Sequence, residues 1–247
     1  MRYAGFPSSY NSLQVRFDRH FERGLTLTTA YTWGKALGYV AENGENANGI
    51  KYYLNVKRNW ARTDFDHTQT FVQSYVWDLP FGSGQRWLKE GLGSKVAGGW
   101  RFSGVLSART GGPLDFGCNC KSLNTPGSGQ SPWVTGPIKK LYGIDTQPWF
   151  DTTVFNDPTI LFSTPTFGNV GRYILSGPNS FNLDASLFKN IRVSERFNLE
   201  FRSEWFSASN TPHFNNPTSL SLGDTNFGLI KGAGGNRNID FALRLMF

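Results

Sequence analysis

The chain of 247 residues contains only two cysteines, too few for the disulfide framework that stabilises many small secreted domains. Charged residues make up 17% of the chain against a usual share of about 25%, whereas aromatic residues reach 15%. This combination excludes a disordered chain, which would be rich in charge and poor in aromatic rings. No apolar run approaches the roughly 18 residues that a membrane-spanning helix needs, so a helical membrane protein is excluded as well.

The net charge is +7, because 25 lysines and arginines outnumber 18 aspartates and glutamates. Such a charge makes nucleic acid or an anionic membrane surface possible partners. Most of the cations, however, alternate with carboxylates along the chain, and neither a zinc-finger spacing nor the aromatic pattern of an RNA-binding sheet accompanies them. We therefore expect no nucleic-acid partner.

What the sequence does have is alternation of apolar and polar residues with a period of two, which is typical of β-strands. The last segment shows it most clearly: one face would carry Ile239, Phe241, Leu243, Leu245 and Phe247, and the other Asn238, Asp240, Ala242, Arg244 and Met246. Together with 28 glycines and many short aromatic runs, this pattern predicts an all-β chain with many turns.

Seven segments follow the pattern, near residues 13–21, 25–33, 68–79, 100–109, 181–191, 197–206 and 239–247. In the third segment the phase stays open, because Phe71, Tyr75 and Trp77 compete with Val72 and Val76 for the apolar face. The connections alternate between short ones, around 22–24, 80–97 and 192–196, and long ones, around 36–66, 110–180 and 207–236. Eight of the 12 prolines lie in 110–180, so we expect a large irregular loop there.

Strand length discriminates between two all-β architectures that both have one apolar face. Several segments run about 10 to 12 residues, whereas strands of soluble sheets are mostly five or six residues long and transmembrane strands need about 9 to 11. The charged exceptions on the apolar faces, Arg19, Lys35 and Lys189, all lie near strand ends. A charge that faces lipid costs about 2–4 kcal/mol at the midplane but only about 0–1 kcal/mol near the interfaces. The pattern favours an antiparallel transmembrane β-barrel segment, and a secreted soluble β-sandwich that binds carbohydrate remains the alternative.

Five ordered stretches and the terminal RLMF also point to one family. They are YNSLQVRFDRHFERGLTLTTAYTWGKAL (10–37), DFDH (64–67), LPFGSG (79–84), GGWRFSGVLSARTGGPL (98–114) and FGNVGRYILSGPNSFNLDASLFKNIRVSERFNLEFRSEWF (167–206). This series resembles the C-terminal β-barrel region of Oar-like TonB-dependent receptors, which are outer-membrane proteins of Gram-negative bacteria. The resemblance implies a barrel of about 22 strands, of which residues 1–247 would be roughly the last third.

The same resemblance implies a function and a set of partners. The full-length receptor would bind a substrate at the cell surface and take it up with energy delivered by TonB, through an N-terminal part and a plug domain that this chain does not contain. Its other partners would be outer-membrane lipid, lipopolysaccharide and the barrel-assembly machinery. Residues 1–10 lack a secretory signal, and seven is an odd number of strands, whereas bacterial barrels close with an even number. We therefore expect the chain to be truncated at its N-terminus.

Two groups of residues are candidates for a role. The alternating row at the C-terminus resembles the signal by which outer-membrane proteins engage the assembly machinery, and an unpaired apolar edge strand is a template for strand addition; it comprises Ile239, Phe241, Leu243, Leu245 and Phe247. The polar faces of the last two strands would look into a barrel lumen, with Glu200, Arg202, Glu204, Asp240 and Arg244 as lumen-facing candidates. Glu200 and Glu204 would lie roughly 13 Å apart, beyond the roughly 5 to 9.5 Å that glycoside hydrolysis requires.

The remaining motifs indicate no chemistry. Cys118 and Cys120 have no histidine nearby, so a local or intermolecular disulfide fits better than a zinc site. Residues 42–49 are rich in Asn, Glu and Gly but lack the spacing of a calcium loop. Neither a phosphate-binding glycine loop nor a nucleophile with a base at a recognised spacing occurs. We expect no catalytic residues, no metal and no cofactor, and the sequence does not identify the substrate-binding residues.

Overall fold

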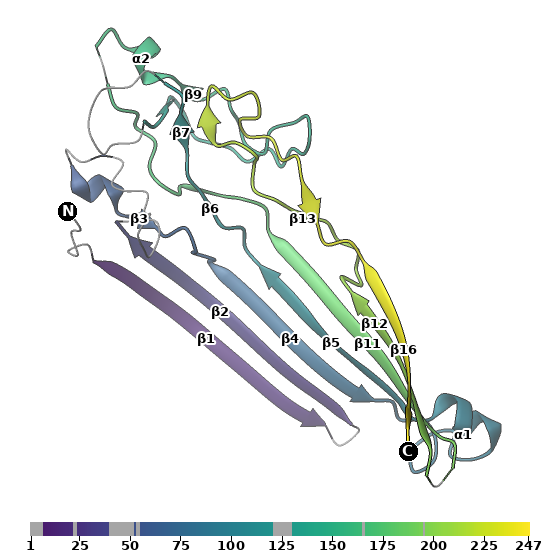
Figure 1. The fold of residues 1–247 in the computed structure, drawn as a ribbon. Coiled ribbons are helices and arrows are strands. Elements are labelled where there is room, and N and C mark those ends of the chain that lie inside the picture. Colours follow the sequence, from purple (N-terminus) through teal and green to yellow (C-terminus); the bar gives the residue numbers. More distant parts are fainter. Residues whose placement is uncertain are drawn as a thin grey trace.

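The computed structural model describes residues 7–21, 24–39, 52, 55–120, 130–164, 166–194 and 196–247. Seven long strands form one antiparallel sheet in chain order (Figure 1): β1 (Ser8–Phe21), β2 (Leu25–Gly38), β4 (Gln69–Asp78), β5 (Trp100–Arg109), β11 (Ser180–Arg192), β12 (Asn198–Phe206) and β16 (Asn238–Met246). The two-residue strand β3 (Ala61–Arg62) extends the pairing of β2. The predicted all-β fold, its antiparallel pairing and its seven long strands are confirmed. The sheet is not closed into a barrel, and β1 and β16 form its two edges.

The strand register gives the sheet one apolar and one polar face, because directly opposed residues of an antiparallel pair point to the same side. One row across the sheet comprises Arg19, Leu27, Tyr75, Gly104, Ala185, Trp205 and Ile239. The adjacent row, which points to the other side, comprises His20, Thr26, Val76, Ser103, Ser186, Glu204 and Asp240. We call these sides the apolar face and the polar face. The register also settles the phase of β4, whose Phe71, Tyr75 and Trp77 lie on the apolar face.

Large apolar side chains of the apolar face are exposed or half-buried, whereas a soluble sheet would bury them. Phe241 is 70% exposed and Leu243 68% exposed. Among the apolar side chains of the described long strands, only those of Ala36 and Ala185 are buried. Nothing in the described part of the chain covers this face as a second sheet would.

The buried core of the protein lies instead in the long connections, which fold together at one end of the sheet (Figure 1). We call this end the long-loop end, and the packed part of 110–180 and 207–236 the loop cap. Its buried apolar residues are Leu114, Phe116, Trp149, Phe150, Phe155, Val170, Leu175 and Ile230. The loop cap contains the two-residue strands β6 (Pro113–Leu114), β7 (Gly117–Cys118), β8 (Trp133–Val134), β9 (Phe155–Asn156), β10 (Leu175–Ser176), β13 (His213–Phe214), β14 (Ser221–Leu222) and β15 (Ala233–Gly234), and the helix α2 (Pro158–Leu161).

Over the described residues of 110–180 the structure has no regular ladder, as the sequence predicted, but it has a packed core that the sequence did not predict. The many prolines of this segment prevent a regular ladder, and its strands pair only in short pieces: β6 with β10, β8 with β9, and β7 with β14 from the third long connection. Aromatic packing supplies the order that backbone pairing does not, because the ring of Phe116 lies 5.1 Å from that of Phe150 and 4.9 Å from that of Phe155.

Phe116 is fully buried in this core, so its truncation should destabilise the loop cap. We expect Phe116→Ala to destabilise the loop cap by about 3–5 kcal/mol, because truncating a buried aromatic ring removes its packing and leaves a cavity. Hydrogen exchange of the loop-cap amides measures this loss. Phe65→Ala is the matched control, since Phe65 is 61% exposed, and equal losses of protection in the two variants would contradict a packed cap.

The opposite end of the sheet carries the short connections, and we call it the short-turn end. The connection between β4 and β5 there contains the helix α1 (Gly91–Ala97), which was not predicted from the sequence. The helix could not be recognised from the sequence pattern, because seven residues are too few to show a helical repeat. A 3-10 helix, Val56–Asn59, precedes β3 at the long-loop end. Among the described residues no helix has the length and apolar composition needed to cross a membrane.

Candidate functional site

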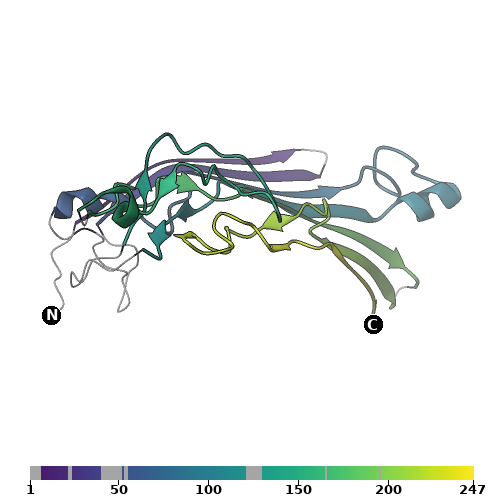
Figure 2. The same cartoon turned by 90° about the horizontal axis from the view of Figure 1, so that it is seen from above.

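A cleft of about 680 Å³ with a mainly polar lining lies between the polar face of the sheet and the loop cap. We call it the polar cleft. The strands contribute Thr70, Ser107, Arg109, Ser180 and Asn182, and the connections contribute Asp64, His67, His213, Asn215 and Asn216, among others. In Figure 2 the segment around β13 runs along one side of the curved sheet, and the cleft lining identifies that side as the polar face.

The DFDH stretch positions one wall of the polar cleft. The buried Asp66 carboxylate accepts a hydrogen bond of 2.7 Å from the backbone N–H of Ala36 at the end of β2. Next to it, the Nδ1 atom of His67 lies 2.8 Å from the carbonyl oxygen of Thr110. Because a carbonyl oxygen only accepts, Nδ1 carries the proton, and a neutral ring keeps Nε2 as an acceptor. The motif therefore joins three segments that are far apart in the sequence.

The opposite wall is built from the start of β11 and the segment after β12. His213 donates through Nε2 to the carbonyl oxygen of Phe181 at 2.6 Å. Asn182 donates to Asp184 at 2.9 Å and accepts from the hydroxyl of Ser207 at 3.0 Å, and the backbone N–H of Ser207 donates to Asp184 at 2.8 Å. These bonds hold the side chain of Asn182 in place on the cleft wall. A fixed set of amide, imidazole and guanidinium groups can bind a polar solute by hydrogen bonds.

Two arginines outside the cleft lining tie the 55–66 segment to the loop cap. Arg62 donates to the carbonyl oxygens of Tyr173 (3.0 Å) and Leu175 (3.2 Å) and to the hydroxyl of Ser176 (2.9 Å). Its Nη1 also lies 3.6 Å from Oδ2 of Asp66. Arg58 donates to the carbonyl oxygen of Gly168. The arginines thus satisfy backbone carbonyls that irregular loops leave without ladder partners.

Two titratable groups of the loop cap are shifted by this packing. Burial raises the pKa of Tyr173 above its usual value, and the negative charge of Asp115 acts in the same direction. Burial lowers the pKa of Lys140, and the positive charge of Arg62 lowers it further. Both shifts disfavour the charged form, as expected for groups that the loop cap partly removes from water.

The structure places the five lumen-facing candidates on the polar face, on β12 and β16, but none of them lines the polar cleft. Arg202 pairs with Glu200 at 2.7 Å, Glu200 faces Arg244 across the strands, and Glu204 faces Asp240. Sequence reasoning missed the cleft residues because they come from four separate segments. Two of these segments lie in DFDH and in SARTGGPL. Both stretches belong to the family resemblance, but no function was assigned to them from the sequence.

The five residues predicted to form the assembly signal lie on or directly after the edge strand β16, and all of them are exposed. The charged exceptions of the apolar face differ from one another. Arg19 lies over the ring of Phe21 at 5.3 Å, and Lys35 is exposed. Lys189 is buried, and its ammonium group donates to the backbone carbonyl oxygens of Lys95 and Val96 in α1.

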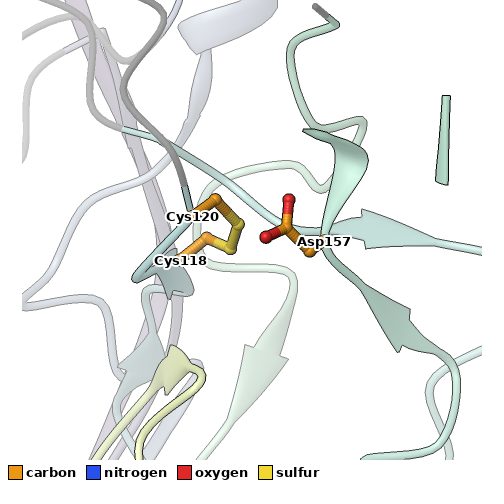
Figure 3. A group of neighbouring side chains, drawn as sticks. All are labelled: Cys118, Cys120 and Asp157. Carbon is orange, nitrogen blue, oxygen red and sulfur yellow. A yellow bond between two sulfur atoms is a disulfide. The ribbon is translucent and has the colours of Figure 1, made fainter. Parts of the chain in front are cut away.

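Cys118 and Cys120 form a local disulfide, one of the two pairings that the sequence left open. Figure 3 shows the disulfide beside Asp157. The two sulfur atoms and a carboxylate oxygen of Asp157 lie within 4.8 Å of one another, close enough to be considered as a metal site. A disulfide offers no thiolate to a metal, and Asp157 accepts two hydrogen bonds from Thr159 at the start of α2. We assign no metal to this cluster. Residues 42–49, which were considered above as a calcium loop, lie outside the described residues.

Comparison with known proteins agrees with the exposed apolar face. The family model described as "outer membrane beta barrel domain" matches residues 1–240. Neither a curated protein nor a solved structure matches the chain. A sheet whose large apolar side chains face outward, while its other face carries the polar groups, is what a barrel in lipid requires. The chain therefore belongs to the outer membrane β-barrel domain family and is a protein of the outer membrane of a Gram-negative bacterium.

Proposed function

We propose that residues 1–247 are the C-terminal part of the β-barrel of a TonB-dependent receptor of the Oar-like kind, which binds a substrate at the cell surface and takes it up. The polar cleft carries this proposal. It lies where the polar face of the sheet meets the loop cap, so a solute bound there would touch both the wall of a barrel lumen and the loops. A barrel that serves only as an anchor would not need such a junction.

The direction of the cleft fits uptake from outside the cell. Outer-membrane barrels have short turns on the periplasmic side and long loops on the extracellular side. The polar cleft lies at the long-loop end, and the pairs of Glu200 with Arg202 and Arg244 lie further down the polar face. A substrate entering from outside would meet the cleft first and these charged residues afterwards. The proposed partners follow: TonB through an N-terminal part, lipopolysaccharide around the loops, and the assembly machinery at β16.

The proposal also includes the absence of enzyme activity. Glu200 is held by Arg202, and the strand geometry separates Glu200 from Glu204 by roughly 13 Å, too far for a pair of hydrolytic carboxylates. The alternative of a soluble, carbohydrate-binding sandwich is not favoured, because the apolar face is exposed and the family is one of outer-membrane barrels.

The coding DNA upstream of Met1 tests the receptor proposal. We expect it to continue in frame into further alternating strands, a plug domain and a signal peptide, because an open sheet would leave unpaired backbone groups at its edges in lipid, each costing several kcal/mol. The protein encoded by the whole frame should then co-purify with TonB from cross-linked membranes. A stop codon and promoter directly upstream, or a full frame without a plug, would contradict the proposal.

A further inference from the structure

The helix α1 lies at the short-turn end, beyond the ends of the strands (Figure 1), and hydrogen bonds connect it to two side chains of the apolar face. The indole N–H of Trp100 donates to the carbonyl oxygen of Val96 at 2.9 Å, and the ammonium group of Lys189 donates to the carbonyl oxygens of Lys95 and Val96. Trp100 and Lys189 face each other on the apolar face of β5 and β11. The C-terminal end of α1 is therefore fixed to the side of the sheet that faces lipid.

The apolar side chains of α1 form a stripe that is largely exposed in the described protein. Leu92 is 81% exposed and Val96 70% exposed, and four residues of spacing place both on one side of the helix. Leu88 extends the stripe, because a Cβ atom added to Gly93 would lie 3.6 Å from Leu88 Cδ2. Three large apolar side chains thus stay exposed in and before a helix whose C-terminal end is bonded to the lipid-facing side of the sheet.

Cations flank the stripe. Arg86, Lys89 and Lys95 are all exposed, against the single acidic residue Glu90 in 85–97. Arg86 lies over the ring of Trp87 at 5.4 Å, and the backbone of Trp87 is bonded to Pro80 and Gly82, so the segment before the helix is held in place. Trp77, Trp87 and Trp100 gather at this end of the sheet, as tryptophans do at a membrane interface.

We propose that α1 is an interfacial helix that binds anionic phospholipid in the periplasmic leaflet of the outer membrane. The short-turn end faces the periplasm, and phospholipid forms the leaflet on that side. The apolar stripe of Leu88, Leu92 and Val96 enters the acyl region, while Arg86, Lys89 and Lys95 contact the phosphates. Lys189 holds the helix in this position by capping its last carbonyls. The inference depends on membership of the outer-membrane family and not on the receptor function.

Two labelling positions test the depth of α1 in a bilayer. An environment-sensitive fluorophore is attached to Leu92→Cys or, as the control, to Ser83→Cys in the same connection, and the mature protein is placed in vesicles of phosphatidylcholine with phosphatidylglycerol. We expect the label on Leu92→Cys to be quenched by spin-labelled acyl chains and shielded from aqueous iodide, and the label on Ser83→Cys to show the reverse. Equal quenching by iodide at both positions would overturn the proposal and leave the stripe open to a periplasmic protein.

Energy transfer from the label on Leu92→Cys to headgroup-labelled lipids tests the charge preference. We expect acceptor-labelled phosphatidylglycerol to be enriched near the helix over phosphatidylcholine, and Lys89→Gln/Lys95→Gln to lower that enrichment by about fivefold per lysine at low salt. Lys139→Gln/Lys140→Gln in the loop cap is the matched control and should leave it unchanged. A Lys89→Gln/Lys95→Gln variant with undiminished enrichment, or one indistinguishable from the control, would overturn the proposal.

Discussion

Leu106→Arg is expected to destabilise the protein in a bilayer by about 2–4 kcal/mol, since it would place a charge on the lipid-facing side near the middle of β5. Leu106 lies on the apolar face, opposite Gln73 of β4 and Leu183 of β11. Neither neighbour carries a charge that could pair with the new guanidinium. Reversible denaturant unfolding of the membrane-inserted protein measures this loss as a lower transition midpoint at an unchanged slope.

Val105→Arg is the matched control for this substitution. Val105 precedes Leu106 in the same strand, is 42% exposed and lies on the polar face opposite Ser74 and Asp184. The same change of side chain at almost the same depth should therefore cost little, because the charge would face water and a carboxylate. If Val105→Arg were as destabilising as Leu106→Arg, the assignment of the two faces would be wrong.

Arg62→Ala is expected to destabilise the loop cap by about 3–5 kcal/mol while leaving the long strands intact. The substitution removes the three acceptor contacts of Arg62 in the loop cap and leaves the side chain of Asp66, only 2% exposed, without its cationic partner. A buried carboxylate that loses its counter-charge accounts for a loss of this size. Amide protection in 110–180 should fall by roughly two to four powers of ten, whereas protection in β4 and β5 should persist.

Two variants separate this effect from a general loss of charge. Arg16→Ala breaks an exposed ion pair with Asp18 and should cost about 0–1 kcal/mol. Arg62→Lys keeps the positive charge but loses the planar fork that reaches several acceptors, so it should fall between Arg62→Ala and the unmodified protein. A loop cap that kept its protection in Arg62→Ala would show that the packed aromatic rings hold the cap without the arginine.

The long strands could be predicted from sequence because a period of two is a local signal. In β16, for example, the apolar Ile239 and the polar Asp240 can be assigned to opposite faces from the local sequence alone, without the neighbouring strand. The phase of β4 could not be predicted in this way, since Phe71 and Val72 are both apolar. It was settled by pairing with β2 and β5, which is a non-local property.

The loop cap and the polar cleft were beyond sequence reasoning for the same reason. Phe116, Phe150 and Ile230 share one core although more than a hundred residues separate the first from the last, and no periodic pattern links them. The role of Arg62 as an anchor depends on carbonyl oxygens near Tyr173, which have no sequence signature at all. Lys189 shows the opposite case: its place near a strand end was predicted, but its capping of α1 needed the helix that the sequence did not reveal.

The apolar face is expected to touch hydrocarbon chains rather than protein. Nitroxide labels placed one at a time along β5, from position 101 to position 108, test it most directly in the membrane-inserted protein. We predict that collisions with oxygen, which partitions into lipid, peak at the positions of Phe102, Gly104, Leu106 and Ala108, and that collisions with a polar nickel complex peak at those of Arg101, Ser103, Val105 and Ser107. Labels on Phe102 and Leu106 that were shielded from both reagents would show that face packed against protein, and would contradict the account.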